Sequence, residues 1–187
     1  MAVIRPHAPA MSVQLDNRPT YSYGVLAFAA VATPTDVVVI QGSASKRVAV
    51  KRIMIWGAAT AAGTMPVQVI RRSTAGTLGS AVLTAVTPAK HDTNQASASG
   101  VVSTVGTANY TSLGTSAGIV ATGRLQMTAL GTGVAAVPFI LDFGDRLTKP
   151  VYLRGASEFC NINFNGAAIP SGGVMDLTIE IEEDDGV

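Results

Sequence analysis

The sequence has little charge, and the charge that it has is balanced. Of its 187 residues 13% are charged, and 13 lysines and arginines stand against 12 aspartates and glutamates, which gives a formal net charge of +1. A protein that binds nucleic acid through its phosphates needs an excess of basic residues on one face. The composition therefore predicts no nucleic-acid partner.

Residues that serve in disulfides and metal sites are scarce. The chain has one cysteine, Cys160, which cannot form an internal disulfide, and two histidines. Because Cys160 lies in the strand-like run EFCNINF, we expect it to pack as a small hydrophobic residue. His91 and Asp92 lie in AKHDTN, where a turn closed by the side chain of Asp92 or Asn94 is the expected interpretation. No metal ion or cofactor is predicted.

Long apolar runs and helical periodicity are also absent. No run approaches the roughly 20 residues that cross a bilayer as a helix, so no membrane partner is predicted. The segment GVLAFAAVAT imitates the core of a signal peptide, but the proline-containing residues before it favour a first strand. No window of about a dozen residues repeats apolar positions with helical spacing. We expect little or no α-helix.

The sequence does contain a succession of strand-like segments from residue 23 onward, which are short runs of Val, Ile, Phe and Tyr bounded by Gly, Pro, Ser, Thr and Asn. In GVMDLTIEIEE, for example, the apolar positions 175, 177, 179 and 181 share one face of a strand. This pattern predicts an all-β chain, a jelly-roll-like two-sheet β-sandwich over residues 23–187. The candidate strands are YGVLAFAAVA, DVVVIQG, KRVAVKRIMIWG, MPVQVIRR, GSAVLTAV, GIVATGRLQMTA, VPFILDFG, PVYLRG, EFCNINFNG and GVMDLTIEIEE.

Two segments do not follow the strand pattern. Residues 1–22 hold three prolines and no periodicity, which predicts an extended N-terminal arm. Residues 85–117 are rich in Ser, Thr, Gly and Ala, and a loop of this length is uncommon unless it is functional or disordered. We expect this loop to pack on something, with GVVSTVG as a short edge strand.

Catalytic patterns are present only out of context. The sequence GTSAG around Ser116 matches a nucleophile elbow, but no helix signal follows it, and both histidines precede the serine where that fold supplies its histidine last. Asp142 and Asp145 flank a glycine turn beside Arg146, which favours a local ion pair over acid–base catalysis. No segment completes a phosphate-binding loop. The sequence predicts a protein that is not an enzyme and has no small-molecule substrate.

Basic residues gather in SKRVAVKRIMIWG, where strict alternation leaves neither face of a strand wholly apolar. A β-bulge near Lys51 and Arg52 would bring Val48, Val50, Ile53 and Ile55 to one side and leave both basic pairs outside. VQVIRRST is expected as a neighbouring strand that adds Arg71 and Arg72 to a basic face suited to an acidic partner. The candidate protein-interaction residues are Arg5, Arg18, Lys51, Arg52, Arg71 and Arg72.

The segments GSASKRVAVKRI, VQVIRRST and FNGAAIPSGG, within residues 33–183, resemble small virion structural proteins of tailed bacteriophages. The resemblance rests on strand and turn texture and involves no catalytic motif. It implies a capsid decoration (cement) protein, a β-sandwich homotrimer that binds the major capsid protein on the head of a virion assembled in the bacterial host cytoplasm.

Two alternatives stay open. Some of the proteins that the chain resembles belong to necks, tails or fibres. A jelly-roll carbohydrate- or receptor-binding module is the other alternative, although 5% aromatic residues and a single tryptophan, Trp56, are few for a sugar site.

Overall fold

The computed structural model describes residues 18–30, 36–106, 108–144 and 149–185, and every regular element in these ranges is a strand. The prediction of an all-β fold is confirmed. The strands are β1 (Thr20–Phe28), β2 (Asp36–Gln41), β3 (Arg47–Ala59), β4 (Gly63–Arg72), β5 (Leu83–Ala85), β6 (Pro88–Lys90), β7 (Val101–Val105), β8 (Ser116–Ala129), β9 (Phe139–Asp142), β10 (Val151–Leu153), β11 (Phe159–Asn163) and β12 (Val174–Asp184).

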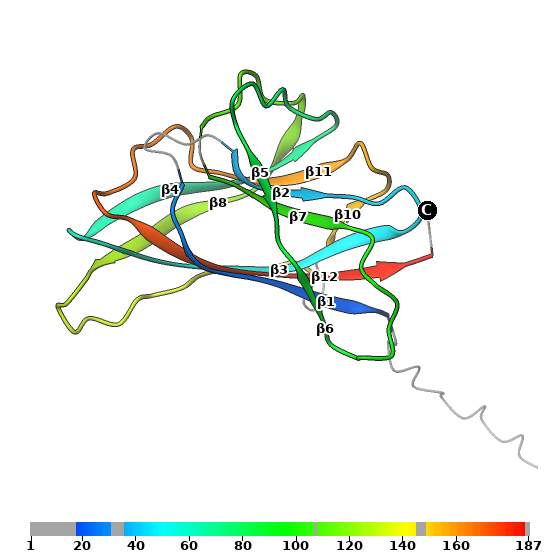
Figure 1. Cartoon of the computed structure of the whole chain (residues 1–187), viewed down its shortest axis with the longest axis horizontal. Helices are drawn as coiled ribbons and strands as arrows, with labels where there is room; N and C mark the ends of the chain where they lie inside the picture. Colours follow the sequence, from blue (N-terminus) through cyan, green and yellow to red (C-terminus); the bar gives the residue numbers. More distant parts are fainter. Residues whose placement is uncertain (1–17, 31–35, 107, 145–148, 186–187) are drawn as a thin grey trace, which may run out of the picture.

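The strands form two layers that belong to one curled sheet (Figure 1). The order along the sheet is β5-β7-β2-β11-β4-β8-β3-β12-β1-β6, and β9 and β10 pair with the remaining length of β3. The two layers join where the last residues of β8 pair in parallel with those of β3, Gly57 opposite Met127. The fold is therefore sandwich-like, as predicted, with its layers continuous instead of separate.

The main core fills the space between the layers. It draws alternate residues from β1, β2, β3, β4, β8, β11 and β12, because every second side chain of a strand points to the same face. In β12 the positions predicted to face inward, Met175, Leu177, Ile179 and Ile181, are all buried. Cys160 is also fully buried in this core, as its strand-like surroundings predicted.

The β-bulge predicted in β3 is confirmed. The pairing of β12 with β3 shifts between Glu180, opposite Arg52, and Ile181, opposite Val50, so Lys51 is the extra residue. The shift turns the side chains on both sides of the bulge inward, and all four apolar residues named for it lie in the core: Val48, Val50, Ile53 and Ile55. Both basic pairs are left on the outer face.

The long Ser/Thr-rich segment packs on the chain's own sheet. β6 pairs with β1, while β7 lies between β2 and β5 and so is not the outermost strand. The Tyr21 hydroxyl donates to the Ala96 carbonyl oxygen at 2.9 Å, which ties the connection between β6 and β7 to the domain. At the other end of the chain, β1 begins at Thr20, so residues 20–22 of the predicted arm belong to the sheet. Residues 1–17 lie outside the described residues.

Candidate interaction surface

The outer face of the β1–β12–β3–β9 layer is charged at one end. There the acidic residues of β12 face the basic residues of β3, because cross-strand partners on one face of a sheet lie side by side. Lys51 Nζ lies 3.1 Å from Glu182 Oε1, and Arg47 Nε donates to Asp184 Oδ2 at 3.1 Å. Arg52 forms ion pairs with Asp142 and Glu180, Lys46 with Asp185, and Arg18 with Glu182 and Asp184. We call this the ion-pair half.

Among the described residues, the ion-pair half carries equal numbers of positive and negative charges. Its five cations, Arg18, Lys46, Arg47, Lys51 and Arg52, meet five carboxylates, those of Asp142, Glu180, Glu182, Asp184 and Asp185. Exposed pairs of this kind each contribute about 0–1 kcal/mol. The basic residues of β3 therefore form a salt-bridged surface and not a positive patch that would attract an acidic partner.

The prediction for Arg72 needs correction. Its side chain is 5% exposed and its guanidinium donates to both carboxylate oxygens of Asp36, at 2.7 and 2.8 Å, and to the Gly114 carbonyl oxygen. Arg72 lies on the outer face of β4, but its contacts with Asp36 of β2 and with Gly114 in the segment before β8 enclose it, so its guanidinium is not available to a partner. Arg71 is partly exposed and pairs with Glu158 at 2.7 Å. Arg5 lies outside the described residues.

The other end of the same face is apolar. Met54 of β3 lies between Thr178 of β12 and Ile140 of β9. Trp56, two residues further along β3, is paired with Asp176 of β12. Ile140 is 48% exposed, although it belongs to a paired strand. Together with the neighbouring loop and the end of β1, these positions make a surface that we call the apolar half-face: Leu26, Met54, Trp56, Ala136 and Ile140.

A second bulge, in β1, pushes Leu26 into this surface. The pairing with β12 shifts between Val25 and Phe28, and Ala27 adopts a left-handed backbone with φ of 52°. The Asp176 carboxylate accepts a hydrogen bond from the Ala27 N–H at 2.9 Å and so holds this unfavourable conformation in place. As a result Leu26 is 83% exposed.

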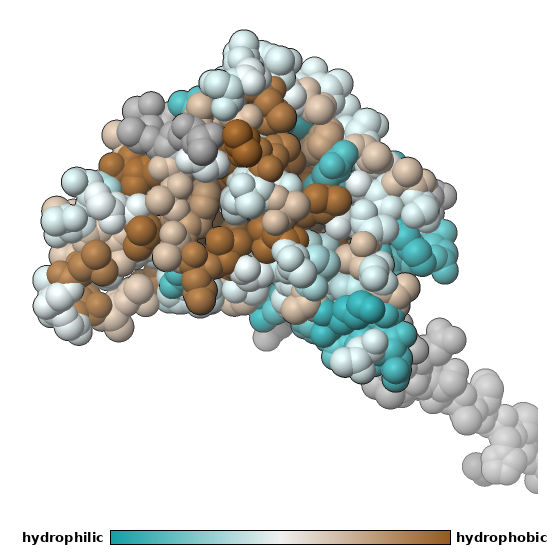
Figure 2. Space-filling view, viewed as in Figure 1, coloured by the Kyte–Doolittle hydropathy of each residue, from teal (hydrophilic) through white to brown (hydrophobic). Residues whose placement is uncertain are grey.

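A groove crosses the apolar half-face, with Leu26, Trp56 and Ala136 among its lining residues and a volume of about 380 Å³. Beside it runs the connection between β8 and β9, LGTGVAAV at 130–137, in which Leu130, Val134 and Val137 are all exposed. In Figure 2 apolar residues spread over the centre and left of the molecule, and hydrophilic residues gather at the lower right. The exposed apolar side chains around the groove, Leu26, Leu130, Val134, Val137 and Ile140, are of the kind that marks interaction sites.

The residues weighed for catalysis and metal binding are engaged elsewhere. Ser116 lies exposed at the start of β8, and its Oγ accepts a hydrogen bond from the Gly118 N–H. His91 Nε2 and Ser22 Oγ share a hydrogen bond of 2.6 Å, and Asp92 closes the predicted turn by accepting from the Asn94 N–H. Asp142 pairs with Arg52, and Asp145 and Arg146, the other charged residues of the predicted turn, lie outside the described residues.

Among the described residues, no group of three His, Cys, Asp or Glu side chains is arranged to hold a metal ion. The same part of the chain contains no helix long and apolar enough to cross a bilayer.

Two buried acidic residues were missed in the sequence, Asp36, which pairs with Arg72, and Glu183. Glu183 continues the alternation of β12 onto the core face, and it accepts hydrogen bonds from the N–H groups of Ser99 and Gly100 and from the Ser99 hydroxyl. It therefore fixes the start of β7 to the last strand. Strict alternation pointed to an inward position for Glu183, but its three donors come from a loop more than 80 residues earlier.

Comparisons with known proteins give no relative for this chain: no family model, curated protein or solved structure matches it.

Proposed function

We propose that this protein is a non-enzymatic structural component of a tailed-bacteriophage virion, a capsid decoration protein that binds the major capsid protein on the head surface and stabilises the shell. The observation that carries the proposal is the apolar half-face. It lies next to an ion-pair half that is already neutral, so the exposed apolar surface is the part of this face that gains most from being covered.

The proposed occupant of the apolar half-face is another copy of the chain, within a homotrimer. Its one charged residue, Asp176, already accepts a hydrogen bond from Ala27, so the surface offers little to attract a charged partner. An equally apolar surface suits it better, and every copy of the chain carries one. Contact between copies would remove Leu26 and Ile140 from water together.

The capsid contact is assigned to the N-terminal arm. The Ser/Thr-rich segment is held on its own domain by β6, β7 and the hydrogen bond from Tyr21, so we do not assign the capsid contact to it. Three arms displayed by one trimer would bind with a high effective concentration, so modest single contacts would add to firm attachment.

The test of the virion assignment is quantitative mass spectrometry of purified particles, with the copy number of this chain compared with that of the major capsid protein. A ratio typical of an abundant shell component is the expected result. A few copies per particle would place the chain in a neck, tail or fibre, and its absence from particles would end the virion proposal.

The test of self-association is Ile140→Asp, with Ile119→Asp as the matched control. Ile119 is 54% exposed on β8, away from the apolar half-face. Sedimentation velocity is expected to show an oligomer for the wild type and the control and a monomer for Ile140→Asp. A wild-type protein that is monomeric at all concentrations, or two variants that behave alike, would contradict the proposed contact.

A carbohydrate-binding module is the second candidate, and one observation favours it. Trp56 lines the groove together with Asp176 and Thr178, an aromatic ring next to hydrogen-bonding side chains. Titration of Trp56 fluorescence with a panel of bacterial surface glycans tests this candidate, and an unchanged spectrum with all of them would reject it.

A further inference from the structure

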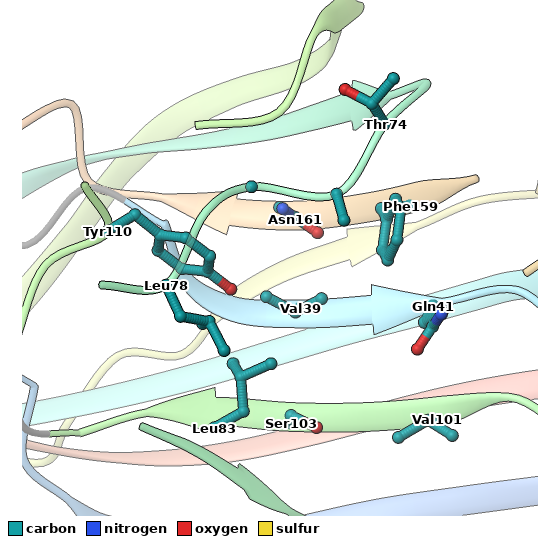
Figure 3. A pocket seen from close by; sticks show the side chains of 12 residues that line it. Val39, Gln41, Thr74, Leu78, Leu83, Val101, Ser103, Tyr110, Phe159 and Asn161 are labelled. Carbon is teal, nitrogen blue, oxygen red and sulfur yellow. The ribbon is translucent and has the colours of Figure 1, made fainter. Parts of the chain in front are cut away.

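A second pocket, separate from the apolar half-face, opens on the outer face of the opposite layer, over β2, β7 and β11. It has a volume of about 180 Å³ and is covered by the segments that follow β4 and precede β8. Figure 3 shows its walls: the rings of Phe159 and Tyr110 and the aliphatic side chains of Val39, Leu78 and Leu83. Phe159 and Val39 also belong to a small apolar cluster on this side of the sheet.

Asn161 lines the pocket, and one of its polar atoms, itself buried, has no partner among the described residues. Asn161 is 4% exposed, and its Oδ1 accepts no hydrogen bond from the described residues. Its Nδ2 donates to Asp36 Oδ2 at 2.9 Å. A buried acceptor left without a donor is destabilising, so a ligand that brings a donor to this atom gains from pairing with it.

The orientation of this amide is fixed by chemistry. The Asp36 carboxylate only accepts hydrogen bonds, and it already receives those of Arg72 and of the Asn163 amide. The Asn161 amide must therefore turn its NH₂ toward Asp36, because the reverse orientation would bring two acceptors together. The Oδ1 is held on the other side of the amide, and in Figure 3 it lies on the side nearer Phe159.

These walls define the chemistry of a ligand. The unpartnered oxygen of Asn161 would repel an anion. A cation would not be attracted by Asp36, because Arg72 already neutralises its charge. Burial raises the pKa of Tyr110 to about 12, so this wall residue is neutral as well. The pocket volume is close to that of an apolar cavity of about 150 Å³ that accepts benzene, and aromatic walls favour a ring in offset or edge-to-face contact.

We propose that this pocket is a binding site for a small aromatic ring that carries a neutral hydrogen-bond donor, as in a phenol. The ring lies between Phe159 and Tyr110, and its hydroxyl donates to Asn161 Oδ1. Such a ring has two possible sources, a free small molecule or the tyrosine side chain of a protein partner. The proposal does not depend on the virion assignment.

The experiment compares phenol with toluene, which has a methyl group in place of the hydroxyl, by two-dimensional NMR of the full chain. Phenol is expected to shift the signals of Asn161, Phe159 and Tyr110, with a Kd at least about tenfold below that of toluene because toluene leaves the acceptor unpaired. Toluene binding as tightly as phenol would overturn the role of Asn161. No shift with either would overturn the site.

A blocking variant locates the binding. Leu83 lies at the rim and is partly exposed, so Leu83→Trp should fill the pocket without disturbing the core and should abolish phenol binding. Leu130→Trp, in the exposed connection before β9, is the matched control and should bind phenol like the wild type. Equal binding by both variants would place phenol elsewhere and reject the proposal.

N-acetyltyrosinamide separates the two sources. If it binds as phenol does, the pocket accepts a tyrosine side chain from a partner. If phenol alone binds, the pocket serves free small molecules.

Discussion

The pair formed by Arg72 and Asp36 is the most enclosed ionic contact among the described residues, and it joins β2, β4 and the segment before β8. Asn161 and Asn163 complete the set of donors around the carboxylate. Both charges have left water, so each depends on the other for its compensation. Removing one partner of such a pair leaves the other as an uncompensated buried charge.

We therefore predict that Arg72→Met destabilises the protein by about 3–5 kcal/mol, since it leaves Asp36 buried without a cation. Urea denaturation measures the change. The control is Arg124→Met, at an exposed position of β8, which should stay within about 0.5 kcal/mol of the wild type. The argument fails if both variants lose the same amount.

Cys160 gives a prediction about alkaline pH. Burial raises the pKa of its thiol from 9.0 to about 12. Between these values the unfolded chain loses the thiol proton while the folded chain keeps it. Stability is therefore constant with respect to this group below about pH 9 and falls as the pH rises toward 12, by up to about 1.4 kcal/mol per pH unit.

Two measurements check this behaviour. At pH 8 the native protein should react with a thiol reagent far more slowly than the urea-unfolded protein, and rapid native labelling would show that Cys160 is accessible. The urea midpoint of Cys160→Ala should also fall less steeply above pH 9 than that of the wild type.

Among the elements, β3 shows what a sequence can and cannot reveal. Alternation of apolar residues located this strand, and the conflict between its two halves located the bulge, because both signals are local. The partners of its basic residues are not local: Glu182 and Asp184 come from a strand about 130 residues later. The burial of Arg72 and the apolar half-face could not be predicted for the same reason. The burial of Arg72 depends on contacts with residues from elsewhere in the chain, and the apolar half-face depends on the register between neighbouring strands.

The bulge should matter more than the charge that it carries. Lys51→Ser removes one partly exposed ion pair and should cost less than about 1 kcal/mol. Deleting Lys51 restores strict alternation, so either Val48 and Val50 or Ile53 and Ile55 must leave the core, at about 1.5–3 kcal/mol for each side chain. Urea denaturation of the two variants compares them, and similar losses would show that the bulge is not needed.

At the scale of the whole molecule, we expect the sandwich to fold without the N-terminal arm and the arm to serve in capsid attachment. Truncation before Arg18 leaves β1 intact, because that strand begins at Thr20. We predict that the truncated chain melts within about 2 °C of the full chain, since a change of 1 kcal/mol shifts the Tm of a domain of this size by about 2–4 °C. Its affinity for capsids lacking the protein should fall at least about tenfold.

Cosedimentation with such capsids measures the binding, and differential scanning calorimetry measures the melting. Unchanged capsid binding would remove the arm from the attachment mechanism. A large fall in the Tm would show instead that the arm contributes to folding.

The place of β12 between β1 and β3 has a consequence for the order of events during synthesis. On the ribosome, the first and third strands must wait for the twelfth before either is fully paired, and contacts of such sequence separation form slowly. The apolar half-face is built from β1, β3, β9 and β12, so it does not exist on a nascent chain that lacks β12. If copies of the chain associate through this surface as proposed, only a chain that already includes β12 is able to do so.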